Sequence, residues 1–64
     1  MRTKLFFVTP AKESVYFDFF IPNLCKDGDL VYDGVIYRIE RIDTSILSNG
    51  ELQQTVILFG KKRR

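Results

Sequence analysis

The chain has 64 residues and a mass of 7.5 kDa, enough for one small domain but not for two hydrophobic cores. It contains no His and one Cys, Cys25, which excludes histidine-based triads, histidine metal sites, intramolecular disulfides and multi-cysteine metal sites. No apolar run approaches the ~18 residues of a membrane span, and the apolar N-terminal stretch is too short for a signal peptide. We therefore expect an intracellular, cytoplasmic protein.

The formal net charge of +2 hides an uneven distribution. Residues 1–60 carry six positive and eight negative side chains, whereas the chain ends with four cations: Lys61, Lys62, Arg63 and Arg64. We therefore expect a mildly acidic β domain over residues 1–60, followed by a flexible basic tail over residues 61–64. Two roles are open for the tail, because adjacent cations can bind phosphates or can only keep an aromatic-rich domain soluble.

The first third of the sequence predicts two strands. Residues 5–8 form a short apolar strand that ends at Thr9-Pro10, with one helical turn at most in the connection that follows. Residues 14–21 are rich in aromatic and β-branched side chains, which favours a strand over a helix. Alternation separates two faces, either of which could be the core: Val15, Phe17, Phe19 and Ile21 on one side, and Tyr16, Asp18 and Phe20 on the other.

A β-hairpin is the clearest local prediction. The β-rich residues 30–32 and 35–43 are separated by Asp33-Gly34, a pair that favours a two-residue turn. Within the second arm, the apolar positions Ile39 and Ile42 are three residues apart instead of two or four. This offset predicts a β-bulge near Glu40-Arg41.

The last part of the sequence predicts one further strand. Residues 44–51 form a connection with a tight turn at Asn49-Gly50, and Ile46 and Leu47 are expected to cap the end of the core. Residues 52–59 form the final strand, which Gly60 ends.

About five short strands joined by tight turns predict an all-β fold, a small antiparallel barrel or curled meander. Residues 28–39 read Gly-Asp, strand, turn, strand, and they resemble a stretch found in many SH3-like barrels. The resemblance implies an SH3-like barrel, and an OB-like barrel is the alternative. It extends to a fold and not to one family, so it implies no ligand-binding residues.

The sequence offers little for catalysis, so we expect a non-catalytic protein without cofactor, metal or small-molecule substrate. Its hydroxyl and thiol nucleophiles have no histidine base, and its eight carboxylates are scattered. Residues 26–29, Lys-Asp-Gly-Asp, weakly resemble part of a calcium loop, but a turn with Gly28 at positive φ is favoured because the other ligands are missing. Cys25 is interpreted as a partly buried packing residue rather than a reactive thiol.

The favoured hypothesis for function is nucleic-acid binding. Arginines interleaved with tyrosines on the predicted hairpin can stack bases and hold phosphates, although the same pattern suits an ordinary solvated hairpin. The basic tail would add sequence-independent phosphate contacts, whereas the net charge of −2 over residues 1–60 opposes binding. The predicted nucleic-acid-binding residues are Tyr37, Arg38, Arg41, Lys61, Lys62, Arg63 and Arg64.

The alternative hypothesis is a protein-interaction or assembly module: a homodimer, or an accessory or inhibitor protein of a phage or mobile element. Both faces of residues 14–21 are apolar, and a contiguous apolar patch on so small a domain usually marks an interface. Tyr16 and Phe20 are the predicted interface residues. No membrane partner is expected.

Overall fold

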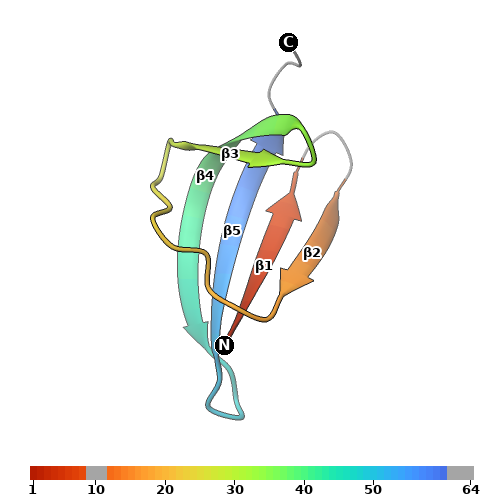
Figure 1. The fold of residues 1–64 in the computed structure, drawn as a ribbon. Helices are drawn as coiled ribbons and strands as arrows, with labels where there is room; N and C mark the ends of the chain where they lie inside the picture. Colours follow the sequence, from red (N-terminus) through yellow and green to blue (C-terminus); the bar gives the residue numbers. More distant parts are fainter. Residues whose placement is uncertain (9–11, 61–64) are drawn as a thin grey trace.

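The computed structural model describes residues 1–8 and 12–60, which contain five strands and no helix (Figure 1). The strands are β1 (Arg2–Phe7), β2 (Glu13–Phe17), β3 (Asp29–Tyr32), β4 (Val35–Ile46) and β5 (Leu52–Gly60). They form one sheet in the order β2-β1-β5-β4-β3, which curls into a half-barrel with β2 and β3 at its edges. The predicted all-β fold of about five strands is confirmed.

One strand pairing differs from the antiparallel arrangement expected from sequence. β1 and β5 run parallel at the centre of the sheet, with Leu5 opposite Val56 and Phe7 opposite Leu58. β1 also begins at Arg2, before the predicted start, because residues 2–4 pair with β5. Parallel neighbours need a long crossover connection, and here that connection contains β2, β3 and β4.

The predicted hairpin and bulge are both present. Tyr32 pairs with Val35, which leaves Asp33 and Gly34 as a two-residue turn with φ angles of 52° and 78°. Positive φ at both positions is the geometry of a type I′ turn, whose twist matches that of the strands it joins. The β4–β5 register shifts between Ile39 and Arg41, as the apolar spacing predicted, and such a bulge bends the strand.

Other local predictions are wrong. The second strand ends at Phe17 instead of residue 21, because the chain then leaves the sheet to cross its concave side. Ile46 does not cap the core, because it is the last residue of β4 and is 75% exposed. It pairs with Leu52, one residue before the point at which β5 begins to pair with β1. The positive φ expected at Gly28 belongs to its neighbour Asp27 (φ 70°). The helical turn expected after Thr9 lies partly outside the described residues, and the basic tail lies wholly outside them.

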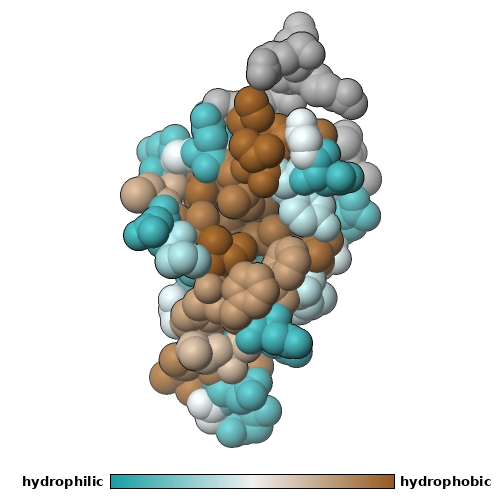
Figure 2. Space-filling model, viewed as in Figure 1, coloured by the Kyte–Doolittle hydropathy of each residue, from teal (hydrophilic) through white to brown (hydrophobic). Residues whose placement is uncertain are grey.

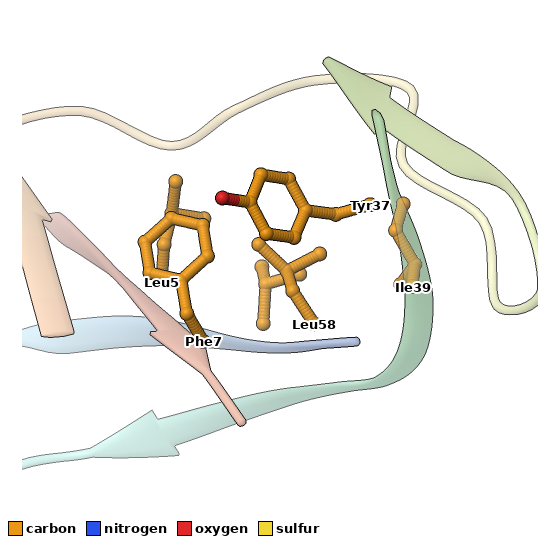
Figure 3. Packing of buried hydrophobic residues seen from close by; sticks show 6 residues of the cluster. Leu5, Phe7, Tyr37, Ile39 and Leu58 are labelled. Carbon is orange, nitrogen blue, oxygen red and sulfur yellow. The ribbon is translucent and has the colours of Figure 1, made fainter. Parts of the chain in front are cut away.

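The hydrophobic core lies on the concave side of the sheet (Figure 3). Its buried members come from the three central strands: Leu5, Phe7, Tyr37, Ile39, Val56 and Leu58. The Phe7 ring packs against two tyrosines, with centroid distances of 4.8 Å to Tyr37 and 5.3 Å to Tyr32. Residues at alternate positions of these strands therefore point to the opposite, convex side.

Residues 18–28, which we call the covering segment, cross the concave side of the sheet and pack Ile21 and Leu24 against the core (Figure 1). Two polar side chains hold this segment. The hydroxyl of the fully buried Thr3 donates to the Phe19 carbonyl at 2.5 Å. The Gln54 side chain accepts from the Ile21 N–H at 3.1 Å and donates to the Ile21 carbonyl at 3.3 Å. Because Thr3 and Gln54 are opposite each other on β1 and β5, they form one anchor, the Thr3–Gln54 clamp.

We predict that Gln54→Leu lowers the free energy of unfolding by about 1–3 kcal/mol, because it leaves the part-buried N–H and carbonyl of Ile21 without their side-chain partner. The neighbouring substitution Gln53→Leu is the matched control. Gln53 lies on the opposite face of β5 and hydrogen-bonds to the side chains of Arg2 and Thr55 instead of the covering segment, so its loss should lower stability by less than the loss of Gln54 does. Urea unfolding of both variants measures the difference. Equal losses would show that the clamp contributes nothing specific.

Candidate nucleic-acid interface

The convex side of the sheet, which we call the outer face, collects cations. Arg2 and Lys4 alternate along β1 with the buried residues, and Arg38 and Arg41 lie on the corresponding side of β4. These are four of the six cations in residues 1–60. The net charge of −2 over those residues therefore conceals a face on which positive side chains gather.

Two aromatic rings of the outer face lie close to cations. The Arg2 guanidinium carbon is 5.3 Å from the ring centroid of Tyr16, and the Lys4 Nζ is 5.9 Å from that of Phe6. Tyr16 is 52% exposed. An exposed cation–π contact contributes about 0.5–1 kcal/mol, whereas a base stacked on an aromatic side chain contributes about 1–3 kcal/mol. A nucleobase can therefore displace the cation from the ring and leave it available for a phosphate.

A third ring, Phe59 on β5, completes a diagonal series that we call the aromatic row: Tyr16, Phe6 and Phe59. Tyr16 is opposite Lys4, and Phe6 is two residues farther along β1. Phe6 is in turn opposite Ile57, and Phe59 is two residues farther along β5. Each step combines one strand spacing with two residues of strand, a distance of about 8 Å between Cα atoms.

Two carboxylates share the outer face with the arginines. Arg38 pairs with Glu40 at 3.1 Å, and Arg41 pairs with Asp43 at 3.0 Å. All four side chains are substantially exposed, and exposed ion pairs contribute only about 0–1 kcal/mol. Within residues 1–8 and 12–60, Arg2 and Lys4 form no ion pair. The outer face therefore offers two cations free of carboxylates and two that are weakly held.

The structure separates the residues that the sequence grouped into a binding site. Arg38 and Arg41 both lie on the outer face, but Tyr37 is 9% exposed and packs in the core, so it cannot present its ring to a ligand. Tyr16 lies on the outer face, whereas Phe20 belongs to the covering segment. The four tail residues, Lys61, Lys62, Arg63 and Arg64, lie outside the described residues.

Sequence reasoning missed the contribution of β1 and of the end of β5. Arg2, Lys4 and Phe6 alternate with buried positions of β1 and so share one face. The predicted strand began at residue 5 and therefore did not include Arg2 and Lys4. That they share this face with Arg38 and Arg41 depends on the strand order β1-β5-β4, for which the sequence carries no local signal.

Two other kinds of site are not found among the described residues. Among them, no three His, Cys, Asp or Glu side chains lie close enough together to hold a metal ion. Nor do residues 1–8 and 12–60 include a helix long and apolar enough to cross a membrane. Cys25 is exposed, not packed as expected, although its carbonyl accepts the Gly28 N–H at 2.9 Å and closes a turn.

Comparison with known proteins gives no relative: no family model, no curated protein and no solved structure matches the chain.

Proposed function

We propose that the protein is a non-catalytic nucleic-acid-binding β domain whose outer face contacts phosphates and bases. The observation that carries the proposal is the gathering of four of the six cations of residues 1–60 on one sheet face, interleaved with aromatic rings. Positive side chains that neutralise phosphates release counterions, which supplies most of the affinity of sequence-independent binding. Aromatic rings beside such cations add base stacking.

The arrangement of strands supports the same proposal. β1 and β4, which carry the four cations, lie on either side of β5. The outward residues of β5 are uncharged: Gln53, Thr55, Ile57 and Phe59. A phosphate between the two rows of cations therefore meets no carboxylate on the central strand. The polar side chains there already form hydrogen bonds: Gln53 donates to Thr55 and accepts from Arg2.

We predict that Lys4→Gln weakens nucleic-acid binding and lowers the slope of log affinity against log salt by about 0.7–0.9, the value for one lost phosphate contact. Lys26→Gln is the matched control, because it removes the same charge from the exposed loop before β3 and should leave the slope unchanged. Fluorescence anisotropy with labelled DNA and RNA at several salt concentrations measures both. Equal effects of the two variants would show that only net charge matters.

A full-length variant with all four tail cations replaced by Gln separates the outer face from the tail. If the outer face carries the site, this variant still binds, and the Lys4→Gln effect persists within it. Complete loss of binding on tail neutralisation would assign the affinity to the tail alone.

We further predict that the double variant Glu40→Gln/Asp43→Asn binds nucleic acid more tightly than the unmodified protein. It removes the carboxylates that hold Arg38 and Arg41, and it also removes their repulsion of phosphates. The matched control is Asp27→Asn/Asp33→Asn, which changes the net charge equally at two loop positions. The same anisotropy assay distinguishes them, and equal gains would argue against a specific role for the outer face.

Protein interaction is a second candidate, supported by a different surface. Several large apolar side chains are exposed away from the outer face, among them Phe19 at 56% and the cross-strand pair Ile46 and Leu52. Figure 2 shows hydrophobic side chains gathered over the concave side, between more polar margins. The edge strands β2 and β3 also leave one side of their backbones available for pairing.

If this second surface mediates self-association, we expect sedimentation velocity to show a concentration-dependent dimer that Ile46→Lys abolishes. A charge at so exposed a position should leave the fold intact, since surface substitutions usually change stability by less than ~0.5 kcal/mol. Ser48→Lys, in the adjacent turn, controls for the added charge. A monomer at all concentrations would contradict self-association.

A further inference from the structure

We infer that the outer face selects single-stranded over double-stranded nucleic acid, with one unpaired base on each ring of the aromatic row. This inference rests on the proposed function and specifies its ligand. It starts from a repeated unit: each ring of the row has a cation beside or opposite it. Arg2 lies over Tyr16, Lys4 lies over Phe6, and Arg38 is the cross-strand neighbour of Phe59.

This repeated unit matches the chemistry of a single strand. A single strand offers the faces of its bases and, for each nucleotide, one phosphate. The rings would take the bases, and the cations that now contact the rings would move to the phosphates. In a duplex the bases are stacked on one another, so their faces are not available to side chains on a sheet.

The hairpin turns argue against docking in a duplex groove. Proteins that read a duplex insert a helix or a two-stranded ribbon into its major groove. The two described turns between strands are unsuited to this role, because the β3–β4 turn carries Asp33, and residues 47–51 between β4 and β5 include Glu51 and no cation. The cations lie instead on the broad face between these turns.

Electrostatics alone would give the opposite preference. A duplex has a higher charge density than a single strand. When binding depends only on counterion release, affinity therefore changes more steeply with salt concentration for B-DNA than for single strands. A preference of the outer face for single strands would therefore require the contribution of the rings, which makes the preference a diagnostic measurement.

The experiment compares labelled single-stranded and duplex oligonucleotides of about ten nucleotides, DNA and RNA, by anisotropy at ~50 mM salt. The full-length protein should bind the single strands at least about tenfold more tightly than the duplexes. Tyr16→Leu should weaken single-strand binding about fivefold or more, as expected for one lost stacking contact, without changing the salt slope. Because Tyr16 is exposed, this variant should remain folded, which thermal unfolding checks.

Two control variants make the result specific. Tyr16→Phe keeps the ring and should bind like the unmodified protein, because stacking needs no hydroxyl. Phe19→Leu removes an exposed ring from the covering segment and should also have no effect. Duplex binding that equals or exceeds single-strand binding, or affinity unchanged by Tyr16→Leu, overturns the inference and leaves the proposed function standing. Binding of neither ligand at low salt overturns both.

Discussion

A single sheet has two faces, and the covering segment lies over one of them, the concave side. The Thr3–Gln54 clamp holds the covering segment over this side through hydrogen bonds to the backbone of Phe19 and Ile21. Both clamp residues are polar, yet they lie on the concave side of β1 and β5, where Thr3 is fully buried and Gln54 is half-buried. Their hydrogen bonds supply partners to part-buried backbone groups of Phe19 and Ile21. Ile21 and Leu24 of the same segment pack against the apolar side chains of the core, so burial and hydrogen bonding together hold the segment.

The outer face lies on the side of the sheet opposite the covering segment. Its exposed side chains, such as Tyr16 and Arg41, must be compatible with water. Long cations meet this requirement because their stems lie along apolar surface while their charged ends reach solvent. The contacts of Arg2 with Tyr16 and of Lys4 with Phe6 are of this kind. This is the surface to which we assign the proposed nucleic-acid site.

The sequence predicted local structure better than it predicted the site. The Asp33-Gly34 turn and the bulge beside Glu40 depend on backbone geometry that a few residues specify, and both predictions were confirmed. The end of β2 at Phe17 was not predictable from residues 18–21, because aromatic residues suit a strand and a covering segment equally well. Tyr37, which the sequence placed with the binding residues, packs in the core for a related reason: alternation separates two faces but does not say which one the rest of the chain will bury.

The parallel pairing of β1 with β5 also has a consequence for how the chain folds. β1 precedes β5 by about 50 residues in the chain, so β1 can find its central partner only after β2, β3, β4 and β5 have been made. The hairpins β3–β4 and β4–β5 can form early, because their contacts are local, whereas closure of the β1–β5 pair spans almost the whole chain. We therefore expect folding to be limited by this one long-range encounter, and to be slower than that of a meander of equal length.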